Sequence, residues 1–226
     1  MNIDSYFSVP ISQTQLPDAE SLNARLKPKI LHWEAHEGDR KSIPTAVAKH
    51  AVYESDFFFF DRNDADVKRL AYFCLNKVGE MMMRLNNYDE SRVRQLRIFC
   101  HSWYHVTRYG GYTGPHNHPM ASWSGVYCLT PGEKPEGYPE SGVLRMMDPR
   151  PNIAMYLDPG NSQLRDPYAT GTLSWHLKPG QLLLFPSYLY HEVAPFWGTD
   201  ERITIAFNAW IREAGEPSGE PGIKAS

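Results

Sequence analysis

The sequence has little of what marks a secreted, membrane-spanning or disulfide-bonded protein. Its three cysteines, Cys74, Cys100 and Cys128, are too few and too scattered for a disulfide framework or a thiolate zinc site. The longest apolar run, residues 57–60, falls far short of the roughly 20 residues that span a bilayer. The polar segment from Asn2 to Ser5 after Met1 does not have the charged and then apolar pattern of a signal peptide. We therefore expect a cytoplasmic protein with a reduced interior and no membrane partner.

An excess of one charge is also missing. The formal net charge is −3 and the pI is about 6.3, which gives no reason to expect a nucleic-acid partner. Hydrophobic residues make up 42% of the 226 residues and aromatic residues 13%, enough to bury a sizeable core and to exclude global disorder. The oligomeric state is open, and a homodimer is one possible assembly.

Helical patterns come first along the chain. Leu22 and Leu26 lie four residues apart, on one face of a first predicted helix. The second predicted helix covers residues 63–87, where apolar residues recur at three-and-four spacing. We predict that this N-terminal segment, residues 1–93, combines helical and extended structure and packs on the remainder of the chain from outside.

From about residue 94 the pattern is that of short strands separated by Gly and Pro. The strand-length runs are residues 96–106, 124–129, 143–147, 173–177, 181–185 and 202–210. Many short strands after a helical segment are typical of an antiparallel barrel or jelly roll. We predict a mainly β fold with flanking helices (α+β). Its core would be a double-stranded β-helix, cupin-like, over residues 94–212, followed by a flexible tail at 213–226.

Three of the nine histidines stand out by context. His116 and His118 are two residues apart, so on an extended segment both rings project from one face. His191 follows a turn and the apolar run 181–185, which return the chain toward the same end of the barrel. Three neutral imidazoles can hold iron, zinc, copper or nickel and leave coordination positions open. A pair at this spacing is more often a surface or hydrogen-bonded pair, so the third histidine carries weight.

A further polar set occupies the strand that begins at Arg202. Alternation places Arg202, Thr204 and Asn208 on one face and apolar side chains on the other. If the apolar face meets the helices, Arg202 points into the barrel, where a guanidinium needs an anionic partner. A salt bridge to Glu201 or Asp200 is the alternative. Together with three metal-binding histidines, an inward arginine predicts a site for a dicarboxylate at a metal.

Several motifs in one order resemble a 2-oxoglutarate (2OG)–iron(II) oxygenase family, related to the prolyl-4-hydroxylase-like enzymes. Along the chain they are His116-Asn117-His118-Pro119, residues 124–127, 148–150 and 179–187, His191, and residues 201–208. The resemblance covers roughly residues 90–212. It implies a double-stranded β-helix enzyme, an oxidoreductase that uses Fe(II), 2OG and O2.

The resemblance also assigns roles by position. His116 and His191 correspond to the two histidine ligands of the metal, and Arg202 to the anchor of the far carboxylate of 2OG. Thr204 would assist Arg202. Cosubstrate contacts are further expected from Tyr109, just before the first ligand, and from Tyr127. Substrate contacts are expected from three residues near the mouth of the barrel, Asn208, Arg145 and Trp175.

The sequence departs from the family's pattern at the second ligand. Related enzymes have Asp where this chain has His118, which gives three histidines instead of two histidines and a carboxylate. Two alternatives stay open. Asp148 or Glu192 could supply the carboxylate, or His118 could contact substrate instead of metal. Related enzymes also tend to have a tyrosine at the position of Cys128, which leaves the other cosubstrate contacts unassigned.

These residues support one leading hypothesis, hydroxylation of an unactivated C–H bond with release of succinate and CO2. The substrate, a small molecule or a peptidyl residue, is not indicated. One rival is a cupin-like three-histidine metalloenzyme that needs no 2OG and binds its substrate's carboxylate at Arg202. The other is a non-catalytic jelly-roll module that binds a ligand.

Overall fold

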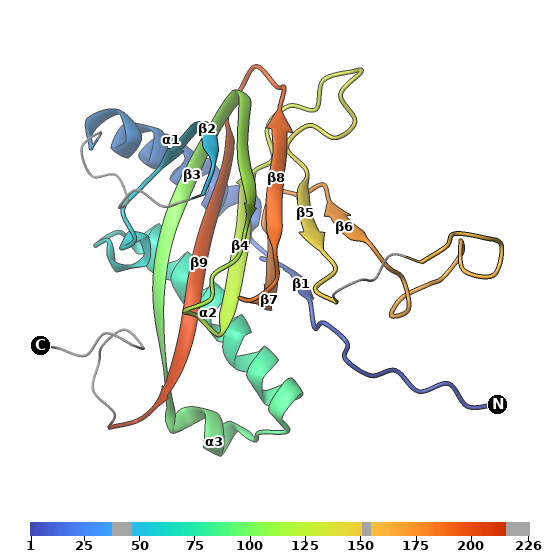
Figure 1. The fold of residues 1–226 in the computed structure, drawn as a ribbon. Coiled ribbons are helices and arrows are strands. Elements are labelled where there is room, and N and C mark those ends of the chain that lie inside the picture. The colour runs from blue at the N-terminus through green and yellow to red at the C-terminus, as the bar shows by residue number, and fades with distance from the viewer. Residues whose placement is uncertain (38–46, 151–154, 216–226) are drawn as a thin grey trace, which may run out of the picture.

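The computed structural model describes residues 1–37, 47–150 and 155–215 (Figure 1). The helices are α1 (Ala19–His36), α2 (Ala65–Asn86) and α3 (Glu90–Arg94), with one 3-10 turn, η1 (Phe59–Asp61). The strands are β1 (Ser12–Gln15), β2 (Lys49–Glu54), β3 (Leu96–His116), β4 (Trp123–Thr130), β5 (Leu144–Met147), β6 (Thr172–Trp175), β7 (Gln181–Pro186), β8 (His191–Phe196) and β9 (Arg202–Glu213). Their order in the sheet is β1-β7-β4-β9-β3-β8-β5-β6, with β2 on β3.

One continuous antiparallel sheet curls upon itself, and the long helices α1 and α2 lie along one side of it (Figure 1). Two buried clusters follow from this arrangement. The larger cluster joins the helices to the outer face of the central strands. The smaller cluster fills the inner side, with Leu144 and Phe185 among its members. The mainly β architecture with flanking helices predicted from the sequence is therefore observed.

Helix α2 forms where the sequence indicated a helix, and its ends have local causes. The carboxylate of Asp64 accepts hydrogen bonds from the backbone N–H groups of Asp66 and Val67, which satisfies two of the donors that every helix start leaves unpaired. Asn87 ends the helix in the left-handed conformation, at φ 54°. The apolar face of α2 covers the sheet.

Strand β9 shows the alternation that the sequence predicted. Ile203, Ile205 and Phe207 belong to the cluster under the helices. Arg202 and Thr204 point to the opposite, inner side of the curled sheet, where both line a pocket. Because side chains alternate strictly along a strand, packing the apolar half of β9 against helices fixes the polar half inside.

Strand β3 organises the site because it is much longer than the run 96–106 suggested. Its first half pairs with β9, and its second half continues to His116 along β8. Gly110 and Gly111 lie where the two halves of this continuous strand meet, at an irregularity in its pairing with β2 and β8. A Cβ at position 111 would lie 2.6 Å from the carbonyl oxygen of Ala51, so only glycine fits this close approach.

The remaining differences from the sequence prediction concern short elements. Strands β1, β2 and β8 and helix α3 were not predicted. Strands β1 and β2 also make the segment 1–93 a contributor to the sheet and not only a cover for it. Strand β9 ends at Glu213, the first residue of the predicted tail, and the tail from residue 216 lies outside the described residues.

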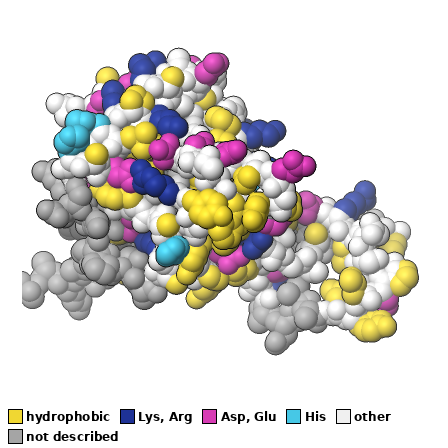
Figure 2. Space-filling view, turned by 90° about the horizontal axis from the view of Figure 1, so that it is seen from above, with side chains coloured by type: hydrophobic (Ala, Val, Ile, Leu, Met, Phe, Trp, Pro, Cys, Tyr) yellow, Lys and Arg dark blue, Asp and Glu magenta, His cyan; other side chains and the backbone are white. Residues whose placement is uncertain are grey.

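Two observations bear on partners. Among the residues that the structure describes, no helix is long and apolar enough to cross a membrane. On the face seen in Figure 2, acidic and basic side chains are interspersed, and no broad area of a single sign is seen among the side chains described there.

Candidate active site

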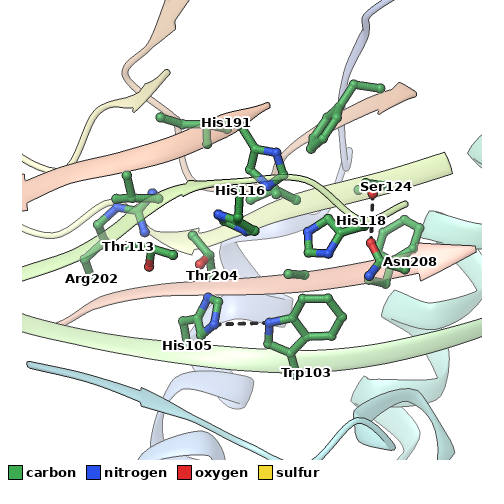
Figure 3. A pocket seen from close by; sticks show the side chains of 17 residues that line it. Trp103, His105, Thr113, His116, His118, Ser124, His191, Arg202, Thr204 and Asn208 are labelled. Atoms are coloured by element: carbon green, nitrogen blue, oxygen red, sulfur yellow. Dashed lines mark hydrogen bonds between the residues drawn. The ribbon is translucent and has the colours of Figure 1, made fainter. Parts of the chain in front are cut away.

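Three histidines converge inside the curled sheet. His116 ends β3, His191 begins β8, and the two are direct partners across these strands. His118 follows two residues after His116. The potential ligand atoms of all three lie within 4.8 Å of one another, and Figure 3 shows the rings turned toward a common centre. The sequence prediction of one three-histidine cluster therefore corresponds to a real convergence of side chains.

Backbone carbonyls fix the orientation of two rings. Nδ1–H of His116 donates to the carbonyl oxygen of Gly114 at 2.8 Å, and Nδ1–H of His191 donates to that of Leu189 at 2.9 Å. A carbonyl only accepts, so Nδ1 carries the proton and Nε2 keeps its lone pair, which is how metal-binding histidines are held. His118 is positioned through its backbone, whose N–H donates to the carbonyl oxygen of Ser187 at 2.8 Å.

The electrostatics favour neutral rings. Burial and the neighbouring imidazoles lower the pKa of His118 to about 3 and that of His191 to about 4. Burial also lowers the pKa of His116. Neutral imidazole is the form that binds a metal. Three converging lone pairs on neutral nitrogen therefore fit a divalent first-row transition metal.

No carboxylate belongs to this cluster within the part of the chain that the structure describes. Asp148 forms an ion pair with Arg150 at 2.6 Å, and Glu192 forms one with Arg145 at 3.1 Å. Neither acid lines the pocket that holds the histidines. The positions of these acids therefore do not support the alternative in which one of them completes a metal site. His118 is the residue placed to be the third ligand.

Arg202 lies at the other end of the same pocket (Figure 3). Only 3% of its surface is exposed, its Nε–H donates to the carbonyl oxygen of Gly142 at 3.1 Å, and its Nη2 is buried without a partner among the described residues. The acids considered in the sequence interact elsewhere. Glu201 pairs with Lys27, and Asp200 accepts a backbone hydrogen bond from Glu133. A buried guanidinium with an unsatisfied nitrogen is the mark of an anion site.

Thr204 and Asn208 share the pocket with Arg202, as the alternation of β9 requires. Asn208 is oriented by a buried network. Ser124 Oγ–H donates to Asn208 Oδ1 at 2.8 Å, and Ser124 Oγ lies 2.9 Å from Ser187 Oγ. The amide NH2 of Asn208 is thereby left as the group available to a ligand.

Four predicted contacts are not brought to this pocket. Tyr109 is 61% exposed and packs edge-on against Trp197. Tyr127 faces the helices, where its hydroxyl donates to Asn23 Oδ1 at 2.7 Å. The assignment of both tyrosines to the cosubstrate is corrected by these positions. Tyr109 lies within β3 beside Gly110 and Gly111, and Tyr127 lies on the outer face of β4, which packs under the helices.

The predicted substrate contacts Arg145 and Trp175 also lie elsewhere. Arg145 is held by Glu140 and Glu192, and Trp175 lines a separate cavity beside Asp148. Strand alternation explains the first case, because it is Leu144 that points inward on β5. Trp175 lies on the edge strand β6, away from the histidines.

Other pocket residues were missed by the sequence reading. Trp103 and His105 line the floor below the histidines, at alternate positions of β3 (Figure 3). In the sheet register they face Ala206 and Thr204 of β9. The alternation of His101, Trp103 and His105 was a usable signal, since it places all three on one face of one strand.

Comparison with known proteins agrees with this geometry. Residues 101–208 match the model of the family described as "Putative 2OG-Fe(II) oxygenase". The chain is similar to this family in sequence pattern and fold. No curated protein sequence matches it.

Solved structures share the fold at low identity. A Pseudomonas putida prolyl-4-hydroxylase is 16% identical, with TM-score 0.55, over 89% of this chain and 92% of that chain. A Trichoplax adhaerens prolyl hydroxylase in complex with a hypoxia inducible factor peptide fragment is 13% identical, with TM-score 0.57, over 88% and 83%. The epimerase SnoN in complex with Fe3+, alpha ketoglutarate and nogalamycin RO is 12% identical, with TM-score 0.59, over 98% and 89%.

The jelly-roll-like fold and the family resemblance predicted from the sequence are thus confirmed. The predicted enzyme class, a 2OG-dependent oxygenase, is that of the family whose model matches residues 101–208. The cofactors of that class, Fe(II), 2OG and O2, are those that the sequence indicated. The residues present fit them, with a neutral nitrogen cluster at one end of a pocket and a buried guanidinium at the other.

Proposed function

We propose that the chain hydroxylates an unactivated C–H bond of an organic substrate, small or peptidyl, and releases succinate and CO2. The observation that carries this proposal is the buried Nη2 of Arg202, unpartnered among the described residues at the end of the pocket on which three histidines converge. Burying a guanidinium is costly unless an anion pairs with it. Its planar fork matches a carboxylate, so a dicarboxylate reaching from the metal to Arg202 satisfies both ends.

In this proposal His116, His118 and His191 hold Fe(II), and Arg202 holds the far carboxylate of 2OG. When bound, the metal and 2OG supply the oxidation, in which O2 is split between succinate and the hydroxylated product as 2OG loses CO2. The Thr204 hydroxyl, on the same face as Arg202, adds a second hydrogen-bonding group for the cosubstrate. Gly142 holds the guanidinium through its Nε, which leaves the other nitrogens for the carboxylate.

The walls of the pocket contribute by excluding water. Leu144, Phe185 and Val193 are among its lining residues, and the cavity itself is only about 40 Å³. An apolar, narrow channel strengthens the ionic contact at its end, because charges attract more strongly where water is excluded.

The test is anaerobic titration of 2OG into the Fe(II)-loaded chain, followed by the visible charge-transfer absorption of the chelate. We expect the absorption to appear with wild type and to be lost or greatly weakened in Arg202→Ala. The matched control is Arg145→Ala, because Arg145 is an equally long cation held by acids outside the pocket. Succinate release in air then measures turnover.

Each outcome separates the candidates. A band that depends on Arg202 and not on Arg145 supports the cosubstrate assignment. A chain that binds iron stoichiometrically and gives no band with 2OG contradicts it. That result would favour the cupin-like alternative, in which Arg202 receives the substrate's own carboxylate.

A further inference from the structure

A second cavity, of about 230 Å³, opens beside the histidines, and Arg202 is not among the residues that line it. It shares His116 and His118 with the first pocket, so a molecule in it lies against the proposed metal ligands. Strands β2 and β3 and the residues around Phe57 form its other walls. Nothing in the proposed handling of 2OG uses this space.

One wall of the cavity is aromatic. Phe57 stacks on His101, with ring centroids 5.9 Å apart and planes 11° from parallel, and meets Trp103 edge-on at 5.2 Å. His101 faces Asn208 directly across the β3–β9 register. This wall offers a flat aromatic surface near His118, with the side-chain amide of Asn208 at its end.

An ion pair also lines the cavity. Lys49 Nζ lies 2.5 Å from Glu54 Oε2, and the same oxygen lies 2.7 Å from His105 Nε2. The two charged side chains are only 19% and 11% exposed, and both line the cavity. A mostly buried ion pair gives little net stability, because desolvation offsets the attraction. Its position on a cavity wall therefore calls for another explanation.

The backbone of β2 is distorted in a way that brings these charges together. Residues 49 and 54 are five apart, so in a regular strand they would project from opposite faces. The register of β2 against β3 shifts between His50 and Val52, and Ala51 there has φ 46°, a left-handed conformation that costs a non-glycine residue energy. The irregularity places Lys49 and Glu54 on the same side.

We propose that this cavity is the substrate compartment and that it takes a free α-amino acid. The carboxylate of the ligand would lie against Lys49, its ammonium group against Glu54, and its side chain along the aromatic wall toward His118. Calling the ligand a substrate rests on the proposed oxygenase function, whereas the binding site itself does not.

Charge and size favour this class of ligand. Lys49 and Glu54 place one cation and one anion side by side on the cavity wall, and a zwitterion answers each charge with its opposite. The volume lies below the range of roughly 300–1,000 Å³ that is usual for drug-sized ligands. A free amino acid is small enough, and it carries its two charges on adjacent groups, as the cavity does.

The first test uses the full chain loaded with Mn(II), without 2OG, and each of the twenty common L-amino acids. Thermal shift identifies ligands, and calorimetry measures their affinity. We expect at least one free amino acid to bind. Its N-acetyl and C-amide derivatives should each bind roughly tenfold more weakly or worse, because each loses one charged contact. Failure of all twenty to bind, or equal binding of blocked derivatives or short peptides, overturns the proposal.

Variants then locate the site. Lys49→Met and Glu54→Gln should each weaken binding of that amino acid by roughly tenfold or more. The matched control is Arg108→Met, which removes an ion pair of the same 2.5 Å length, between Arg108 on β3 and Glu34, outside the cavity. Unchanged binding in both cavity variants overturns the proposal. If either variant fails to fold, the comparison of free and blocked ligands on wild type decides.

The result is independent of the 2OG titration. A chain that shows the 2OG absorption but binds no amino acid keeps the oxygenase function and loses this substrate class. A chain that binds an amino acid but gives no 2OG absorption keeps the compartment and loses the proposed function.

Discussion

The carbonyl oxygen of Gly142 accepts a hydrogen bond from Nε of Arg202 at 3.1 Å, and the two residues are in close contact. Gly142 has φ 63°, and a Cβ placed on it would lie 3.0 Å from Cδ of Arg202 and 3.2 Å from its Nε. This glycine therefore does two things that no other residue does as easily. It adopts a left-handed conformation, and it leaves room for the buried guanidinium.

Gly142→Ala should weaken 2OG binding without removing the metal. The added methyl group pushes against Arg202, and the left-handed backbone adds strain of about 1–3 kcal/mol. We expect the affinity for 2OG to fall by roughly tenfold, measured as the midpoint of the anaerobic absorption titration. Gly137→Ala is the control, since Gly137 has φ 85° and a Cβ added there would meet nothing within 4 Å. Equal 2OG affinity in both variants would show that Gly142 does not position the arginine.

Tyr127→Phe should destabilise the fold and leave the site intact. The hydroxyl of Tyr127 donates to Asn23 Oδ1 at 2.7 Å, and Asn23 Nδ2–H donates to the carbonyl oxygen of Leu129 at 2.8 Å, so this buried network joins α1 to β4. Removing the hydroxyl leaves a buried acceptor unsatisfied, at a cost of about 1–3 kcal/mol. Urea unfolding measures the loss. Tyr72→Phe, at a residue 73% exposed, should change stability by less than about 0.5 kcal/mol.

The 2OG titration of the same variant tests the corrected position of Tyr127. Its affinity should match that of wild type, because the hydroxyl points away from the pocket. A variant with unchanged stability and weaker 2OG binding would reverse that conclusion.

The metal-free chain should lose stability as the pH falls below neutrality. The pKa values of His118 and His191, about 3 and about 4, lie below their ordinary 6.5, so between these values the unfolded state binds more protons than the folded state. The contribution of the neutral rings to the free energy of unfolding is therefore complete above pH 6.5 and declines as the pH falls toward 4. Urea midpoints at pH 7, 6 and 5 measure this decline. The urea midpoint of His118→Gln should fall less steeply with pH than that of wild type. Parallel curves for the two proteins would contradict the assignment of this pH dependence to His118.

How far the sequence predicts this molecule depends on strand alternation. Where a strand is regular, as in β9, the apolar residues identify the helix-facing side and place Arg202 and Thr204 inside without further information. The same rule, applied to β4, would have put Ser124 inside and Tyr127 outside. The assignment of Tyr127 to the cosubstrate overlooked a pattern that was present in the sequence.

Where strands are irregular, alternation fails. The shift between His50 and Val52 breaks the count that links Lys49 to Glu54, and no local pattern reveals a left-handed Ala51. The irregular stretch of β3 opposite Ala51 lies between Thr107 and Tyr112, so it includes Tyr109. Such features arise from pairing between distant segments, so they are decided by tertiary structure.

His118 provides the last prediction, because it is where the chain departs from the two-histidine, one-carboxylate pattern. If His118 is a ligand, His118→Ala should lower Fe(II) affinity by at least roughly ten- to hundredfold, since even the residues that support metal ligands have effects of that size. His118→Asp should retain the metal but add a negative charge beside it. Because 2OG is a dianion, the added carboxylate repels it, and the affinity for 2OG should fall below that of wild type. Competition with a metallochromic chelator measures the Fe(II) affinity, and the absorption titration measures the 2OG affinity.

His176→Ala is the control, because His176 is exposed and lines none of these cavities. Wild-type iron affinity in His118→Ala would instead leave His116 and His191 as the only histidine ligands among the three and make His118 a contact for the substrate.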